Sequence, residues 1–183
     1  MDNRYTQKKV FSVDVETDGL YGAPFAIAAV VWDRDACTTV DKFEGLVDFV
    51  CHDEWVADNV VPIFAEKKPT YAHLEDMLNA FWDFWRKHSG EGTVVVAHCA
   101  NPVEAGLFRR CVELDLDQRK FQGPMIIHDV GTLLLMMGAD PHSINDFLKK
   151  HEIEPPLTGV DHDPSYDAEI ALFAWLGIEK TLN

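Results

Sequence analysis

The 183-residue chain is 47% hydrophobic and 26% charged, as expected for one globular domain, residues 1–183, with a substantial core. It has no apolar run that could cross a bilayer and no signal-peptide layout at its start, so we expect a cytoplasmic protein. Its four cysteines form no C-x-x-C or zinc-ligand pattern, so we expect reduced thiols. The net charge of −15 argues against a protein that grips long nucleic acid by its phosphates, because such binding relies on lysines and arginines.

The first half of the chain predicts three strands and a long helix. Lys8 to Val15 is rich in valine and phenylalanine, Phe25 to Trp32 is a continuous apolar run, and a third strand is expected around Thr39 to Val47. Asp48 to Pro69 predicts a short helix and a long loop. From Tyr71 to His88 apolar residues recur at helical spacing, which predicts an amphipathic helix.

The second half predicts strands that alternate with helices. The expected strands are Thr93 to Ala97, the clearest in the sequence, and a short one at Met125 to Ile127. The expected helices are Pro102 to Leu114 with Asn101 as N-cap, Val130 to Met137, Ser143 to His151 with Ser143 as N-cap, and Ser165 to Leu176. This order predicts an α/β domain with a mixed five-stranded sheet, in which an antiparallel meander is followed by two strands reached through helical crossovers.

Two carboxylates lie at the end of the first predicted strand. Asp14 and Glu16 are two residues apart, so their side chains share one face of the strand and can reach one metal ion. The pattern Asp-x-Glu alone is a weak signal, and surface charge at a strand end is the alternative. The strand is too apolar for a surface position, and a turn at Thr17-Asp18-Gly19 follows it, which favours a functional role.

A histidine and an aspartate, His162 and Asp167, are five residues apart near the C-terminal end of the chain. Asp167 is expected in the first turn of a helix, where its alternative role is to complement the helix dipole. A histidine beside metal ligands can accept a proton from water as a general base. One histidine among eight means little, and its spacing to Asp167 is what makes it a candidate.

These motifs together resemble those of DnaQ-like 3′-5′ exonucleases of the DEDDh group, in the ribonuclease H-like superfamily. The first family motif, D-x-E-T-x-G-L, stands here as Asp14 to Leu20. The third motif, a histidine five residues ahead of an aspartate, stands as His162 and Asp167. The resemblance extends from about Phe11 to Leu176 and implies the ribonuclease H-like fold, with helices flanking the mixed sheet.

The middle motif departs from the family pattern. The family has a strand, then His-Asn, then an aspartate on the next helix, whereas here His98 is followed by Cys99 and Glu104 occupies the aspartate position. Glutamate keeps the charge and the oxygen donors but adds a methylene, which can shift or loosen a metal site. A capping box of Asn101 with Glu104 is the competing interpretation, because it would direct the glutamate to the helix backbone.

The resemblance also implies a mechanism and a substrate. In that case two magnesium or manganese ions are held by four carboxylates, and His162 helps to activate water for hydrolysis of the terminal phosphodiester at the 3′ end of single-stranded DNA or RNA. The family cradles the terminal nucleotide with backbone near the Thr17 position and an apolar residue at the Leu20 position. The implied ligands are Asp14, Glu16, Glu104 and Asp167. A homodimer is compatible with the family, and no membrane partner is expected.

Two further groups of residues could contact nucleic acid. Arg109-Arg110 and Arg119-Lys120 are the main basic pairs and could guide a strand, although solvated surface charge is the commoner role of such pairs. The aromatic residues between Phe81 and Trp85 recur at helical spacing, as core residues do, and only Trp82 falls off the expected apolar face.

Three functions are compatible with these residues. The first is an exonuclease acting on single-stranded ends, and the second is an exoribonuclease or oligoribonuclease acting on short RNA. The third is a catalytically degenerate exonuclease fold that binds nucleic acid or a partner. Glu104 motivates the third function, whereas the other motif residues are intact and argue against it, so we predict the first.

Overall fold

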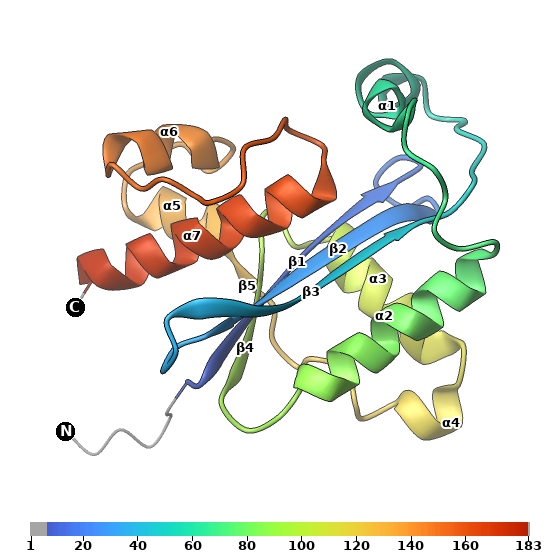
Figure 1. Cartoon of the computed structure of the whole chain (residues 1–183), viewed down its shortest axis with the longest axis horizontal. Coiled ribbons are helices and arrows are strands. Elements are labelled where there is room, and N and C mark those ends of the chain that lie inside the picture. Colours follow the sequence, from blue (N-terminus) through green and yellow to red (C-terminus); the bar gives the residue numbers. More distant parts are fainter. Residues whose placement is uncertain (1–6, 183) are drawn as a thin grey trace.

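A five-stranded mixed sheet forms the centre of the molecule, in a computed structural model that describes residues 7–182 (Figure 1). The strand order is β3-β2-β1-β4-β5. β1 pairs antiparallel with β2 and parallel with β4, β2 pairs antiparallel with β3, and β4 pairs parallel with β5. The predicted topology, an antiparallel meander followed by two parallel strands, is therefore confirmed. The strands are Lys9–Thr17 (β1), Pro24–Asp33 (β2), Thr38–Leu46 (β3), Thr93–Ala97 (β4) and His128–Asp129 (β5).

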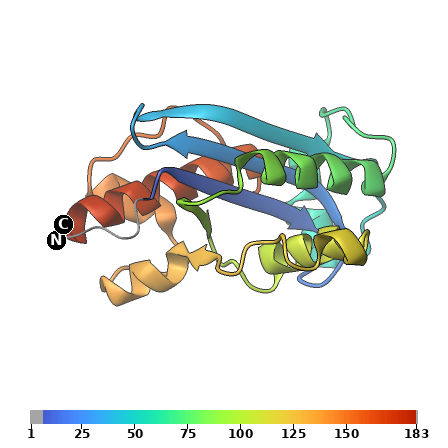
Figure 2. The same cartoon turned by 90° about the horizontal axis from the view of Figure 1, so that it is seen from below.

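Helices cover both faces of the sheet (Figures 1 and 2). One face is covered by α2 (Leu74–His88) and α3 (Val103–Glu113), and the other by α5 (Val130–Met136), α6 (Ile144–Lys150) and α7 (Pro164–Leu182). No helix within residues 7–182 combines the length and apolar character needed to cross a membrane. The shorter elements are α1 (Glu54–Asn59), the 3₁₀ helix η1 (Val61–Phe64) and α4 (Leu116–Arg119).

The central strand β1 divides its side chains between the two helical layers. Val10 belongs to the core shared with α7, and the alternate residues belong to the core shared with α2 and α3, namely Phe11, Val13 and Val15. Since side chains alternate across a strand, Asp14 and Glu16 share the face of Val10. Both carboxylates therefore project toward the layer that contains α7.

A carboxylate holds the loop that follows β1. Asp18 accepts hydrogen bonds from the backbone N–H groups of Asp53 (2.8 Å) and His52 (2.9 Å), and these bonds hold the pKa of Asp18 well below its usual range. Gly19 has a φ of +72° in the same loop, a conformation that favours glycine. The loop beyond Glu16 is thus tied to the segment that precedes α1.

Some predicted elements differ from the observed ones. Met125 to Ile127 is not a strand, because only His128 and Asp129 pair with β4, and the Met125 side chain is fully exposed. The short helix α4 has no predicted counterpart, since one helical turn carries too little periodicity. α7 continues to Leu182, beyond its predicted end. Ser143 is confirmed as an N-cap, because its hydroxyl accepts a hydrogen bond from the N–H of Asp146.

Trp82 belongs to the core, contrary to the expectation that it falls off the apolar face of α2. Its side chain is 3% exposed, and the guanidinium carbon of Arg119 lies 5.2 Å from the centroid of its ring. Phe81 and Trp85 are buried as well. This aromatic row therefore stabilises the fold rather than providing a surface on which bases could stack.

Phe11→Ala tests whether the core beneath β1 positions the strand. Phe11 is fully buried and contacts the rings of Phe81, Phe84 and Trp85. Loss of these contacts should lower the free energy of unfolding by about 3–5 kcal/mol, measured by urea denaturation. Val40→Ala is the control, because Val40 is 47% exposed and its truncation should change stability by less than about 1 kcal/mol. A loss as small as the control's would contradict this role.

Candidate active site

A cleft of about 530 Å³ opens where β1 ends. It is lined by residues of β1, of the connection from β4 to α3, of the start of α6 and of the start of α7. Asp14 and Glu16 enter the cleft from β1, Glu104 from the first turn of α3, and Asp167 from the first turn of α7. The fold thus brings together four carboxylates from three separate segments of the sequence.

The tightest part of this cluster contains Glu16, His162 and Asp167. One potential ligand atom of each residue lies within 4.8 Å of those of the other two. The backbone N–H of His162 donates a hydrogen bond of 2.7 Å to Asp167 Oδ2. His162 Nδ1 is 3.6 Å from Glu16 Oε1, which is an ion-pair distance but too long for a hydrogen bond. The imidazole is therefore close to both carboxylates without a hydrogen bond to Glu16.

Contacts from the α1 and η1 region flank the loop that carries His162. The residue has a φ of +68°, and its side chain is 39% exposed. Its ring meets the ring of Trp55 edge-on, with centroids 5.4 Å apart and an interplanar angle of 84°. The neighbouring Asp163 pairs with Lys67 Nζ at 2.7 Å. The histidine is held from two sides but remains accessible from the cleft.

Glu104 does not form the capping box that was its alternative role. α3 has Pro102 as its N-cap, with no side-chain capping hydrogen bond, so the expectation that Asn101 caps this helix is wrong. The Glu104 side chain is 3% exposed, and its Oε2 has no hydrogen-bond partner among the residues that the structure describes. A buried, unpaired carboxylate oxygen is costly, and a bound cation would satisfy it.

Burial raises the pKa of all four carboxyl groups, and repulsion among the acidic side chains adds to this effect. It raises the pKa of Glu16 to about 8, with contributions from Asp167 and Asp163. It raises the pKa of Glu104 to about 8 and that of Asp167 to about 7. The pKa of Asp14 is raised well above its usual value by burial and by its acidic neighbours in the cleft.

His98 is a further residue of the cleft, which the sequence indicated only as part of a motif. Its Nε2 lies 2.8 Å from the carbonyl oxygen of Pro141, so this nitrogen carries the proton and donates it. Proximity to His98 lowers the pKa of Glu104 and Asp167, against the larger effect of burial. The available signal was its position directly after β4, because parallel strands such as β1 and β4 present their carboxyl ends at one edge of the sheet.

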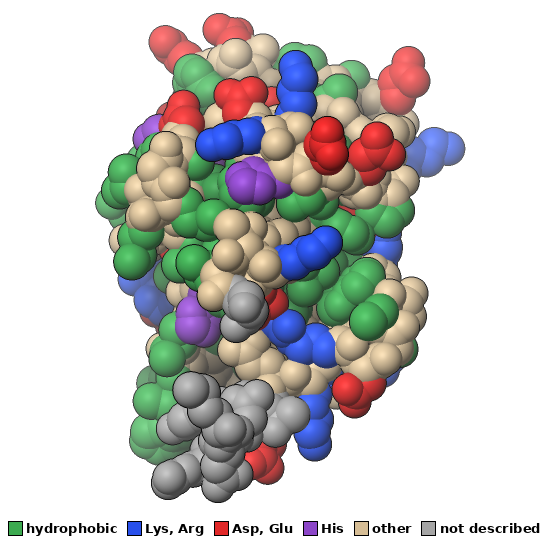
Figure 3. All heavy atoms as spheres, turned by 90° about the vertical axis from the view of Figure 1, so that its left-hand side faces the viewer, with side chains coloured by type: hydrophobic (Ala, Val, Ile, Leu, Met, Phe, Trp, Pro, Cys, Tyr) green, Lys and Arg blue, Asp and Glu red, His purple; other side chains and the backbone are tan. Residues whose placement is uncertain are grey.

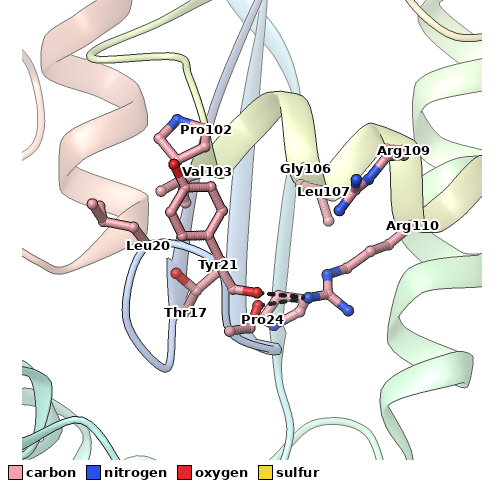
Figure 4. A pocket seen from close by; sticks show the side chains of 11 residues that line it. Thr17, Leu20, Tyr21, Pro24, Pro102, Val103, Gly106, Leu107, Arg109 and Arg110 are labelled. Carbon is pink, nitrogen blue, oxygen red and sulfur yellow. Dashed lines mark hydrogen bonds between the residues drawn. The ribbon is translucent and has the colours of Figure 1, made fainter.

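The two residues expected to contact the terminal nucleotide, Thr17 and Leu20, line a small pocket next to the cleft (Figure 4). Leu20 lines both the cleft and a small neighbouring pocket, and it is 64% exposed. Thr17 lines the small pocket, and its hydroxyl donates a hydrogen bond of 2.7 Å to the carbonyl of Gly19. Leu20 is therefore part of the cleft that contains the carboxylates, whereas Thr17 lines the neighbouring pocket.

The donor set of the cleft fits a divalent cation. Carboxylate oxygens are hard ligands of the kind that magnesium and manganese bind. Within residues 7–182, no lysine or arginine forms an ion pair with Asp14, Glu16, Glu104 or Asp167. In the described part of the chain these carboxyl groups therefore have no permanently charged partner, and the basic groups near them are the histidines His98 and His162.

We expect the metal-free protein to lose stability as the pH rises from about 5 to 8. The pKa values of Glu16 and Glu104 in the folded state, each about 8, lie above the usual value of 4.5. Between these two pKa values the folded state binds more protons than the unfolded chain. The free energy of unfolding is therefore highest at low pH and falls as the pH rises toward 8. Thermal unfolding in EDTA should show this loss, and magnesium ions should reverse it.

Glu104→Gln should flatten this pH dependence. At pH 8 it should stabilise the metal-free protein by on the order of a few kcal/mol, since each pKa unit corresponds to about 1.4 kcal/mol. Glu113→Gln is the matched control, because Glu113 is an exposed residue of the same helix and should not alter the pH profile. The claim that ionisation of these carboxyl groups destabilises the metal-free protein would be contradicted by a melting temperature that does not change with pH in EDTA. Identical profiles of melting temperature against pH for the two variants would also contradict it.

No protein-family model and no curated protein matches the sequence, but solved structures match the fold. E. coli exonuclease I in complex with a dA16 oligonucleotide is matched over 96% of this chain and 41% of its own, with a TM-score of 0.67 and 14% identity. The nuclease domain of 3′hExo, a DEDDh family member, bound to rAMP, is matched over 100% and 94% of the chains, with a TM-score of 0.65 and 11% identity.

Exonuclease X in complex with 5′ overhanging duplex DNA is matched over 94% of this chain and 92% of its own, with a TM-score of 0.57 and 20% identity. This chain thus spans about 41% of the length of exonuclease I and nearly the whole length of the other two. At such identities the likeness concerns the fold. The chain has the ribonuclease H-like fold found in DEDDh exonucleases.

Proposed function

We propose that this chain is a metal-dependent 3′-5′ exonuclease that hydrolyses the terminal phosphodiester bond of single-stranded nucleic acid and releases nucleoside 5′-monophosphates. The observation that carries the proposal is the convergence of four carboxylates in one cleft, with no ion-paired lysine or arginine among the described residues. The fold supports it, because the similar structures include exonucleases solved with DNA or an oligonucleotide.

Asp14, Glu16, Glu104 and Asp167 are the residues that would hold two magnesium or manganese ions. When bound, such ions supply Lewis-acid chemistry that lowers the pKa of water and stabilises a leaving oxygen. The carboxylates bring acceptor oxygens from β1, α3 and α7 to one place, and the packed sheet and helices fix that place. Glu104 fits a ligand role because one of its oxygens has no hydrogen-bond partner within residues 7–182.

His162 is proposed as the general base. Its imidazole accepts a proton from the water that attacks the terminal phosphorus, and the bond between phosphorus and the 3′ oxygen of the preceding nucleotide breaks. The departing 3′ oxygen takes up a proton from solvent, and Glu16 Oε1 lies 3.6 Å from Nδ1 of the imidazole. The edge of the Trp55 ring limits where the imidazole can move, and the exposed part of the side chain keeps a path for the proton to solvent.

The rim of the cleft fits the end of a single strand. Leu20 presents an exposed apolar side chain beside the carboxylates, where it would contact the base of the terminal nucleotide. The strong negative charge of the chain disfavours extended contacts with a duplex, so the proposed substrate contacts are few and local.

A degradation assay tests this function. Strands of DNA and of RNA that carry a fluorescent label at the 5′ end are incubated with magnesium, manganese or EDTA. We expect a ladder of labelled products that shortens one nucleotide at a time, and no products in EDTA. Immediate release of a labelled mononucleotide would instead indicate cleavage from the 5′ end. Intact strands with every ion, despite binding, would contradict the enzyme and favour a degenerate binding module.

Asp14→Asn tests the placement of the site. Loss of a charged ligand should lower the rate by at least about 100-fold while leaving the protein folded, as judged by circular dichroism. Asp35→Asn is the matched control, because Asp35 lies in the exposed turn between β2 and β3 and should leave the rate unchanged. Equal rates for the two variants would show that the site is elsewhere.

A further inference from the structure

In each of the two basic pairs, Arg109-Arg110 and Arg119-Lys120, one residue bonds to the protein itself and the other faces solvent. In the first pair, Arg110 donates hydrogen bonds to the carbonyl oxygens of Tyr21 (3.1 Å) and Gly22 (2.9 Å), which fixes the loop between β1 and β2 (Figure 4). Its neighbour Arg109 has its side chain 69% exposed, and its contact with Glu113 is a long one of 3.8 Å. Arg109 is therefore available to an outside anion.

The second pair is divided in the same way. Arg119 donates hydrogen bonds to the carbonyl of Cys111 (2.9 Å) and to Asn79 Oδ1 (2.7 Å), and it covers the ring of Trp82. Lys120 is exposed. In a chain with 16 basic and 31 acidic residues, Arg109 and Lys120 are the members of these pairs left to the surface, and both line the same groove.

This groove lies along α3 and the segment after α4 and has a volume of about 750 Å³, a size typical of ligand sites. Besides the two cations, it presents large apolar side chains to solvent. Phe121 is 91% exposed, Met125 is 100% exposed, and Leu116 is 57% exposed. Exposed apolar side chains gathered in one hollow indicate a binding surface.

The groove adjoins the acidic cleft and shares one lining residue with it. Asn101 lines both hollows, because the chain passes between them where it enters α3. Arg109 lines the groove and also the small pocket that contains Leu20 (Figure 4). A strand whose last nucleotide reaches the carboxylates would therefore have to cross Asn101 to reach the groove.

We propose that this groove binds the part of a single strand that lies on the 5′ side of the bond to be cleaved. The inference rests on the proposed function, which places the 3′-terminal nucleotide in the acidic cleft. Arg109 and Lys120 contact phosphates, and Phe121 and Met125 contact bases. Two basic side chains and one acidic side chain, Glu113, line the groove, so its net charge is positive. A positively charged groove with exposed aromatic side chains is the usual means of binding single strands without sequence preference.

Charge decides between this occupant and a protein segment. The acidic cleft and the overall charge of −15 repel a polyanion, so a strand needs local cations near the site, and the groove supplies two. An apolar protein segment would need the exposed side chains but not the cations. The salt dependence of binding therefore separates the two occupants.

The test measures binding of a 5′-fluorescein dT12 strand by anisotropy over a range of salt concentrations, with calcium in place of magnesium. Substitution of both Arg109 and Lys120 by alanine should reduce the slope of log Kd against log salt by about 1.4, since each phosphate contact on a single strand contributes about 0.7. Phe121→Ala should weaken binding by about tenfold at fixed salt. Lys180→Ala should change neither quantity.

Lys180 is a suitable control because it lies in the last turn of α7, about 20 Å along the helix from Asp167 by helical rise. The face at that end of the molecule mixes acidic, basic and hydrophobic side chains (Figure 3). An unchanged slope in the double variant, with unchanged affinity for Phe121→Ala, would overturn the proposal. The exposed apolar side chains of the groove would then be assigned to binding a protein partner.

Cleavage assays distinguish a failure of the proposed groove from a failure of the proposed enzyme activity. In magnesium, the ratio of kcat/KM for dT12 to that for a mononucleotide p-nitrophenyl ester should fall about tenfold or more in the double variant. Cleavage of both substrates with an unchanged ratio would overturn the groove alone. Binding with the predicted slope but no cleavage would support the groove and contradict the proposed enzyme.

Discussion

The central constraint on the structure is the convergence of four carboxyl side chains at one end of its central sheet. Asp14, Glu16, Glu104 and Asp167 meet in one cleft, and the described part of the chain supplies no lysine or arginine to pair with them. Burial and repulsion favour their protonated forms, which is why their pKa values rise. A divalent cation removes this penalty, so the same interaction that weakens the metal-free fold would create the affinity for metal.

The rest of the fold holds these charges in place. β1 is the central strand and packs through Phe11 and its alternate neighbours against α2 and α3, which prevents the carboxylates from separating. The loop around His162 is restrained by Trp55 and by the ion pair of Lys67 with Asp163. Arg110 secures the loop after β1, because it donates hydrogen bonds to the carbonyl oxygens of Tyr21 and Gly22. Rigid support of this kind is what positioned ligands require.

The sequence was sufficient for the first four strands and for the convergence of the motifs at the two ends of the chain in one cleft. The strand Thr93–Ala97 was predicted at its observed bounds, because a run of valines is a local signal. The sequence could not exclude a capping box at Glu104, because a capping box and a metal ligand require the same spacing, and only the observed start of α3 excludes it. β5 was misplaced because two edge residues carry no periodicity. The groove that contains Phe121 depends on packing between distant segments, which no local pattern reports.

Calorimetric titration with manganese ions at pH 7, repeated in buffers of different ionisation enthalpy, tests the central claim most directly. Because the pKa values of Glu16 and Glu104 are about 8 and that of Asp167 is about 7, the metal-free site holds protons at this pH. Binding must expel them, so we predict release of at least about one proton per protein and a smaller release from Glu104→Gln. Manganese binding without proton release, or no binding, would contradict the account.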